Sequence, residues 1–192
     1  ALLDAAFAVD RPLEDDRTAA VLATSGSTGA PHGVLLSAEG LLALHPWREM
    51  PSSWVAALPL TSMGGFNVLV RALSAQAPIV ALHSLAGAEH FTAQDFAESV
   101  ELAAREGLPV RTSLVPAQLA RLLDSHRGLE ALQRCENVLI GGAALDPALR
   151  ARAQDVALTA TYGATETSGG CVYDGIALPG AHVELAPDGR IT

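Results

Sequence analysis

The chain of 192 residues carries a formal net charge of −9, and 49% of its residues are hydrophobic while 17% are charged. This composition is typical of a globular protein with a sizeable core, and it argues against a disordered chain. The acidic balance disfavours nucleic acids and anionic membranes as partners, and Arg71 and Pro78 interrupt the richest apolar region, so no membrane insertion is expected.

Short apolar runs bounded by turn residues recur along the chain and predict strands, most of them buried on both faces. The expected strands are Val21–Thr24, Trp54–Leu58, Ile79–Leu82, Val110–Leu114, Val138–Ile140 and Ala157–Tyr162.

Helical patterns lie between these runs. Thr92 with Asp95 forms a capping arrangement for a helix that ends near Gly107, and Asp146 is a candidate N-cap. The other expected helices are Gly65–Ser74, with one apolar face, and Pro116–Asp124 and Pro147–Ala153, which begin with proline. Strands and helices that alternate in this way predict an α/β fold, with a mainly parallel sheet and flanking helices.

The end of the sequence has a different pattern. Pro187-Asp188-Gly189 is a turn signature between the segments Ala181–Ala186 and Arg190–Thr192, which predicts a β-hairpin. We therefore expect residues 1–180 to form the α/β core and residues 181–192 to begin a β-rich subdomain of a longer protein.

A dense cluster of hydroxyl and glycine residues, Thr24-Ser-Gly-Ser-Thr-Gly-Ala-Pro-His-Gly33, follows the first expected strand. Small side chains leave backbone N–H groups accessible, so this loop suits phosphate binding, with a structural turn as the alternative. It is not a Walker loop, because Ala30-Pro31-His32 follows the last glycine of the cluster where that motif needs Lys. The predicted phosphate contacts are Thr24, Ser25, Gly26, Ser27, Thr28, Gly29 and Gly33.

Two further motifs follow in order, Ile140-Gly141-Gly142-Ala143-Ala144-Leu145 and Tyr162-Gly163-Ala164-Thr165-Glu166. With the loop, they resemble the signature of the adenylate-forming superfamily of acyl-CoA synthetases, luciferases and adenylation domains. The resemblance implies ATP and Mg²⁺ as cofactors, with Mg²⁺ at Glu166 and catalytic roles for Thr165, Glu166 and His32, which stands where the family carries Lys. It places the nucleotide beside Gly141, Gly142, Ala143, Tyr162 and Gly163.

Each of these positions also has a structural interpretation. Gly141-Gly142 could form a tight turn after a buried strand, and Glu166 could be a solvated surface carboxylate. The six histidines show no metal-binding spacing.

The run Glu166-Thr-Ser-Gly-Gly-Cys-Val-Tyr-Asp-Gly175 and the segment Thr112–Leu119 are most similar to the o-succinylbenzoate–CoA ligases of menaquinone biosynthesis. This likeness implies an aryl carboxylic acid, o-succinylbenzoate, and coenzyme A as substrates. It assigns the acid site to Arg71, Ser113, Gly65, Thr167 and Ser168, with Arg71 holding the succinyl carboxylate. Alternatively, Arg71 could extend its guanidinium to solvent from an apolar helix.

The sequence thus predicts the core of an AMP-forming acid–thiol ligase that works by positioning and electrostatics. All 12 of its Lys or Arg residues are arginines, and the family's mobile C-terminal domain with its catalytic lysine is absent, so we expect this chain alone to be inactive. A non-catalytic nucleotide- or acid-binding module is the alternative. A serine hydrolase is disfavoured because the sequence has no Gly-x-Ser-x-Gly elbow.

The distant cysteines Cys135 and Cys171 are expected to be reduced thiols, since no Cys-x-x-Cys spacing is present. The N-terminus lacks the basic head of a signal peptide, which favours a cytoplasmic location. A homodimer is left open.

Overall fold

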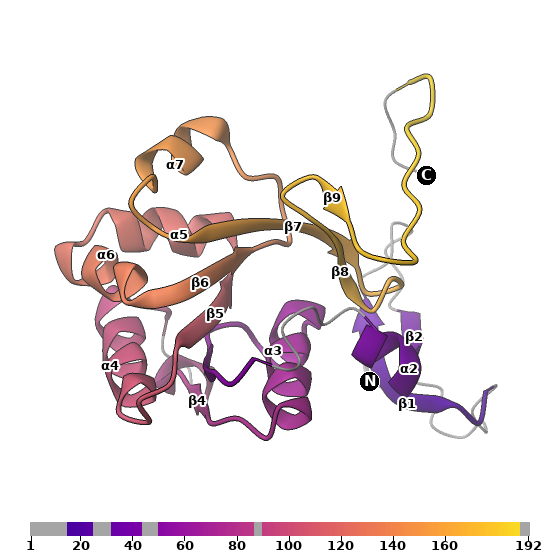
Figure 1. The fold of residues 1–192 in the computed structure, drawn as a ribbon, viewed down its shortest axis with the longest axis horizontal. Helices are drawn as coiled ribbons and strands as arrows, with labels where there is room; N and C mark the ends of the chain where they lie inside the picture. Colours follow the sequence, from indigo (N-terminus) through magenta and orange to yellow (C-terminus); the bar gives the residue numbers. More distant parts are fainter. Residues whose placement is uncertain (1–14, 25–31, 44–49, 87–89, 189–192) are drawn as a thin grey trace.

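The computed structural model describes residues 15–24, 32–43, 50–86 and 90–188 (Figure 1). Its main element is a seven-stranded sheet in the order β4-β3-β5-β6-β7-β8-β9. The first five strands are parallel, and the last two run antiparallel to their neighbours. This confirms the predicted α/β fold. The strands are β3 (Ser53–Ala56), β4 (Ile79–Ala81), β5 (Val110–Leu114), β6 (Cys135–Ile140), β7 (Leu158–Ala164), β8 (Gly169–Tyr173) and β9 (Ile176–Ala177).

Helices cover both faces of the parallel part of this sheet (Figure 1). Helices α4 (Ala93–Ala104), α5 (Pro116–Leu123) and α6 (His126–Gln133) pack on one face, where Val55 contributes to the core. Helix α3 (Met63–Ser74) packs on the other face, against Trp54 and Ala56. Successive residues of β3 therefore alternate between two apolar cores, which is why the strand is hydrophobic throughout.

Side-chain caps set the starts of several helices. The hydroxyl of Thr92 accepts a hydrogen bond from the Asp95 N–H at 3.1 Å, and the Asp146 carboxylate accepts one from the Ala148 N–H at 2.7 Å at the start of α7 (Pro147–Arg152). Both caps confirm the prediction. Ser62 caps α3 in the same way, so this helix begins before the expected Gly65. Helix α6, capped by Ser125, was not predicted.

The first two strands lie outside the main sheet. β1 (Thr18–Thr24) pairs antiparallel with β2 (His32–Ser37), and a helix, α2 (Ala38–Ala43), follows. The prediction that Val21–Thr24 is buried on both faces was wrong, because only Leu22 of this stretch is buried. The physical reason is the connection: the link between Thr24 and His32 is too short for the crossover that a parallel neighbour needs, whereas it suits a hairpin.

Near the C-terminus the strands pair antiparallel, as the predicted fold class required: β8 pairs with β7, and β9 pairs with β8. In the expected hairpin of residues 181–192, Leu185 makes a single bridge and Pro187 and Asp188 lie in a turn, while Arg190–Thr192 falls outside the described residues. A 3₁₀ turn, η1 (His83–Leu85), completes the described elements.

Both cysteines are free, as expected, and the structure buries both. Burial raises the pKa of the Cys135 thiol to about 12. Within the described parts of the chain, no helix combines the length and apolarity needed to cross a bilayer.

The core packing predicts the effect of truncating Phe96, which is 0% exposed on α4. Phe96→Ala should lower the free energy of unfolding by about 3–5 kcal/mol, because it leaves a cavity in the larger core. Leu102, on the same helix, is 48% exposed, and Leu102→Ala should change this free energy by no more than about 0.5 kcal/mol. Urea unfolding measures both values, and equal losses for the two variants would contradict the predicted core.

Candidate functional site

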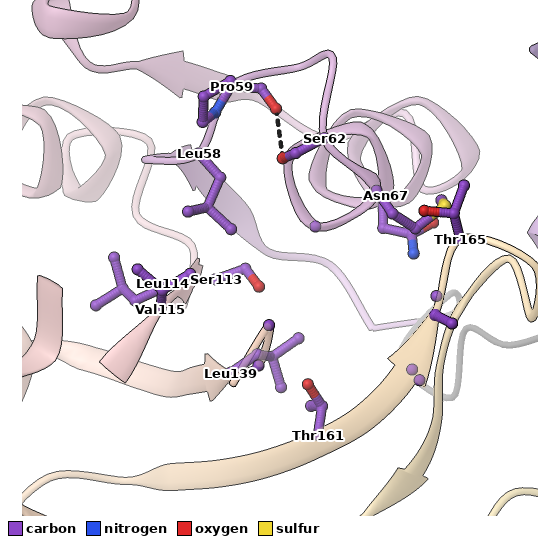
Figure 2. A pocket seen from close by; sticks show the side chains of 18 of the residues that line it. Leu58, Pro59, Ser62, Asn67, Ser113, Leu114, Val115, Leu139, Thr161 and Thr165 are labelled. Carbon is purple, nitrogen blue, oxygen red and sulfur yellow. Dashed lines mark hydrogen bonds between the residues drawn. The ribbon is translucent and has the colours of Figure 1, made fainter. Parts of the chain in front are cut away.

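A cavity of about 550 Å³ lies between α3 and the carboxyl ends of the parallel strands β5, β6 and β7. This edge is where open parallel sheets bind ligands. Figure 2 shows Ser113, Leu139 and Thr161 on the sheet side of the cavity, with Ser62 and Asn67 on the helix side. We call this space the α3 cavity. Its polar lining residues are Ser62, Asn67, Arg71, Ser113, Gln118, Thr161, Thr165 and Tyr173.

Arg71 is the cation of the α3 cavity. Its side chain is held on the third turn of α3, is 5% exposed, and donates a hydrogen bond from Nη2 to the Tyr173 hydroxyl at 3.1 Å. Its guanidinium carbon lies 5.5 Å from the centroid of the Trp54 ring. Desolvation lowers the pKa of Arg71, an effect that the Tyr173 hydroxyl opposes. Arg71 is therefore directed inward, not toward solvent as the alternative interpretation required.

The turn after β7 is tied to α3. Asn67 Nδ2 donates to the Ser168 carbonyl oxygen at 2.9 Å, and both residues are buried. Within the turn, Thr167 Oγ1 accepts from the Ala164 N–H at 2.8 Å and also bonds the carbonyl oxygens of Ala164 and Gly169. The hydroxyl of Thr167 is thus engaged with the backbone of its own turn.

A second cavity of about 580 Å³ adjoins the first on the side of Tyr162 and Ala143. Gly142, Thr161 and Gly163 line both cavities. A Cβ on Gly141 would come within 2.5 Å of Thr161 Oγ1, and Gly142 has a φ of +78°, so the Gly141-Gly142 pair serves a close backbone approach as well as a turn. We call this space the glycine cavity.

The structure brings eight of the predicted site residues to these two cavities. Gly141, Gly142, Gly163, Thr165, Arg71 and Ser113 line the α3 cavity, and Ala143 and Tyr162 line the glycine cavity. Glu166 is exposed in the turn after β7, next to Thr165.

Other predicted residues lie elsewhere. Thr24, His32 and Gly33 are at the facing ends of β1 and β2, and His32 is exposed there. Ser168 is buried near Gly40, and Gly65 supports the start of α3. The predicted phosphate contacts Ser25, Gly26, Ser27, Thr28 and Gly29 fall outside the described residues.

Sequence reasoning missed Asn67 and Gln118, which line the α3 cavity. Asn67 stands one helical turn before Arg71, so a second polar residue on the same face of an apolar helix was a usable signal. Tyr173 lies in the run from Glu166 to Gly175 that the sequence analysis singled out, but its contact with Arg71 was not predicted, because the two residues stand 102 positions apart. Asp174 has a structural role, since its carboxylate accepts hydrogen bonds from Arg150 at 2.8 Å and from the Ala160 N–H at 3.1 Å.

Among the described residues there is no group of three or more His, Cys, Asp or Glu side chains that could hold a metal ion. Glu166 alone is a carboxylate at the turn beside the cavities. One carboxylate suits Mg²⁺ when the remaining oxygen ligands come from phosphates and water, so the residues present fit a nucleotide-bound Mg²⁺ and not a metal held by protein alone.

Comparison with known proteins shows which family has this sequence and fold. A family model described as AMP-binding enzyme matches residues 4–190. Over 187 residues the chain is 41% identical to the "Probable 2-succinylbenzoate--CoA ligase" of Mycobacterium tuberculosis, covering 92% of the chain and 46% of that relative. It is 28% identical over 198 residues to the 2-succinylbenzoate–CoA ligase of Listeria monocytogenes, covering 91% and 39%. The chain thus spans about half the length, or less, of the curated relatives it matches.

Solved structures share the fold. The O-succinylbenzoate coenzyme A synthetase (MenE) of Bacillus subtilis, in complex with AMP, has a TM-score of 0.71 at 22% identity, over 92% of this chain and 48% of that one. The N-terminal domain of FACL13 from Mycobacterium tuberculosis has a TM-score of 0.68 at 19% identity, over 95% and 49%.

The fold and the adjoining cavities define an α/β domain with two cavities at the carboxyl edge of a parallel sheet, where such sheets bind ligands. The chain belongs to the AMP-binding enzyme family. This confirms the resemblance that its three motifs carry.

The environment of Tyr173 predicts a pH effect. Burial raises the pKa of its hydroxyl, which the Arg71 guanidinium only partly offsets. Tyr173 should therefore stay protonated in the folded protein at about pH 10, the ordinary value for tyrosine. Because the folded-state pKa is the higher one, the stability that this residue contributes is present below about pH 10 and is lost as the pH rises through the folded-state pKa.

Ultraviolet absorbance of tyrosinate, recorded against pH, measures this ionisation. Tyr173 and Tyr162 are the two tyrosines of the sequence, so Tyr173→Phe should remove the late step and Tyr162→Phe should leave it unchanged. A late step that survives in Tyr173→Phe would show that this hydroxyl is not the desolvated one.

Proposed function

We propose that this chain is the nucleotide- and acid-binding part of an AMP-forming acid–CoA ligase, and that its acid is 2-succinylbenzoate, as in menaquinone biosynthesis. The observation that carries the proposal is the buried Arg71 guanidinium at the α3 cavity, next to a second cavity built around Gly142 and Gly163. The names of the relatives support the same acid.

Arg71 suits a dicarboxylic acid. A guanidinium presents paired N–H donors that match a carboxylate, and the interaction is strong where water is excluded. Trp54 supports the guanidinium from the side and Tyr173 fixes one of its nitrogens. With one carboxylate held at Arg71, the other end of the acid is free to lie at Gly142, Thr161 and Gly163, where the two cavities meet.

The glycine cavity suits a nucleotide. Tyr162 is 50% exposed and offers a ring face, and Gly142 and Gly163 present backbone without a side chain to the cavity. We assign the phosphates to Thr165 and to the segment from Thr24 to Gly33, and Mg²⁺ to Glu166. Structures of MenE from Bacillus subtilis in complex with AMP, and with ATP and magnesium ion, support this assignment.

When bound, ATP would supply the adenylyl group, which the acid carboxylate takes up with release of pyrophosphate, and coenzyme A would supply the thiol that then displaces AMP. The residues of this chain bind and orient. Arg71 holds the distal carboxylate, and apolar neighbours such as Leu139 exclude water between the two ends of the acid. Thr165, with His32 as a further candidate, would offset charge on the phosphates. Positioning of this kind contributes much of the rate enhancement in phosphoryl chemistry.

The division into a core of residues 1–180 and a β-rich subdomain from residue 181 is part of the proposal. Thr167, Ser168 and Gly65 support the acid site through the turn after β7 and the start of α3. The cytoplasmic location and the homodimer stay predictions.

Arg71→Ala tests the acid site. The variant should weaken binding of 2-succinylbenzoate by on the order of 2–5 kcal/mol, because a desolvated ion pair is lost. Its affinity for ATP should change little, since Arg71 does not line the glycine cavity. Calorimetric titration with each ligand measures both affinities.

A monocarboxylate analogue that lacks the succinyl carboxylate should lose far less affinity in the same variant. Arg121→Ala is the matched control, because this arginine is exposed on α5 and bonds a backbone carbonyl. Equal losses for the two acids would leave Arg71 as a structural residue and would remove the basis for this substrate.

A further inference from the structure

Asn67 connects the two halves of the candidate site. It lies on α3 among apolar residues, is 3% exposed and lines the α3 cavity. Its amide nitrogen bonds the Ser168 carbonyl oxygen at 2.9 Å, across 101 residues of sequence. A carbonyl oxygen only accepts hydrogen bonds, so it is Nδ2 and not Oδ1 that faces the turn after β7.

The turn is shaped around this amide. A Cβ on Gly169 would come within 1.9 Å of Asn67 Nδ2, and Gly169 has a φ of +115°, so no other residue fits there without displacing the contact. Ser168 itself has a φ of +57°, an uncommon conformation for a residue with a side chain. A strained residue persists only where its surroundings hold it. Thr167 holds this turn from within, and Asn67 holds it from α3.

The amide oxygen of Asn67 indicates which of its atoms contributes to the structure. Asn67 Oδ1 is buried and has no hydrogen-bond partner in the described structure. A buried acceptor without a partner costs about 1–3 kcal/mol, so an apolar residue of the same shape would avoid that cost at this position. The contribution of Asn67 must therefore come from Nδ2 and the turn that it holds.

That turn carries Thr165 and Glu166, which the proposed function assigns to the phosphates and Mg²⁺. We propose that Asn67 is a positioning residue for the metal–nucleotide site: from the acid side of the cavity, its Nδ2–Ser168 bond sets where Thr165 and Glu166 stand. The inference rests on the proposed function and adds a residue to it. Because Arg71 lies one turn further along α3, the same rigid helix places both the acid-binding cation and this bond.

The test compares Asn67→Leu with the wild type. The substitution keeps the size of the side chain and removes Nδ2, so the affinity for ATP in the presence of Mg²⁺ should fall about three- to tenfold, the value of one hydrogen bond. With EDTA in place of Mg²⁺, the loss of affinity for ATP in Asn67→Leu should be clearly smaller, because Glu166 then has no metal ion to bind. Calorimetry gives all of these values.

Asn137→Leu is the matched control. Asn137 is the other asparagine of the sequence, and its Nδ2 also donates one hydrogen bond, to Thr159 Oγ1 at 2.9 Å, away from both cavities. This variant should keep the Mg²⁺ dependence of the wild type. Equal losses with and without Mg²⁺ in Asn67→Leu, or the same loss in both variants, would overturn the proposal and leave Asn67 as a structural residue.

A measurement on the wild type covers the case in which Asn67→Leu does not fold. With asparagine labelled in ¹⁵N, the side-chain amide signal of Asn67, assigned by its persistence in Asn137→Leu, should shift on addition of ATP with Mg²⁺ and not with EDTA. If the chemical shift of this signal is the same with and without Mg²⁺, the positioning role is overturned. If ATP with Mg²⁺ does not bind the wild type at all, the proposed function itself is wrong.

Discussion

The contact on which the candidate site depends is the close approach of α3 to the chain that leaves β3. A Cβ on Gly65 would lie 2.2 Å from the Pro59 carbonyl oxygen and 2.6 Å from that of Leu58, so only glycine allows the helix to begin there. Ser62 completes the junction, because its hydroxyl donates to the Pro59 carbonyl oxygen at 2.7 Å and caps the helix (Figure 2). The start of α3 therefore decides which of its faces meets the cavity.

This placement directs polar groups into an otherwise apolar interface. Arg71 is nearly fully buried between Trp54 and Tyr173, and desolvation lowers its pKa. Taking a guanidinium out of water is costly, and the cost is recovered in part by the aromatic ring and the hydroxyl that surround it. A cation prepared in this way interacts strongly with a carboxylate, because little water remains to screen the pair. These features are the basis of the proposed acid site.

The two cavities share three lining residues, Gly142, Thr161 and Gly163. Gly142 and Gly163 line both, and a Cβ on Gly163 would lie 1.9 Å from the Gly169 carbonyl oxygen. Groups bound on the two sides can approach each other closely at such a boundary, which a reaction between an acid and a nucleotide requires. The turn that follows β7 then supplies Thr165 and Glu166 at the same edge of the sheet.

The sequence by itself determined the class of fold and the motifs at the site. Alternating apolar runs and helical patterns predicted the parallel strands β3 to β7, because hydrophobic periodicity is a local property that burial on both faces imposes on each strand. The glycines at 141, 142 and 163 were recognisable for a similar reason, since close backbone approach demands that residue type.

Other features were decided only by tertiary structure. β1 pairs with β2 across a loop. The apolar pattern of Val21–Thr24 is equally compatible with a place in this two-stranded sheet and with a place in the seven-stranded sheet. The Asn67–Ser168 and Arg71–Tyr173 contacts join residues about 100 positions apart, so no local pattern encodes them. The sequence also did not determine whether Arg71 faces solvent or a cavity, because an arginine in an apolar helix can extend in either direction. Packing of α3 against the sheet, with Trp54 beside the guanidinium, selects the inward direction.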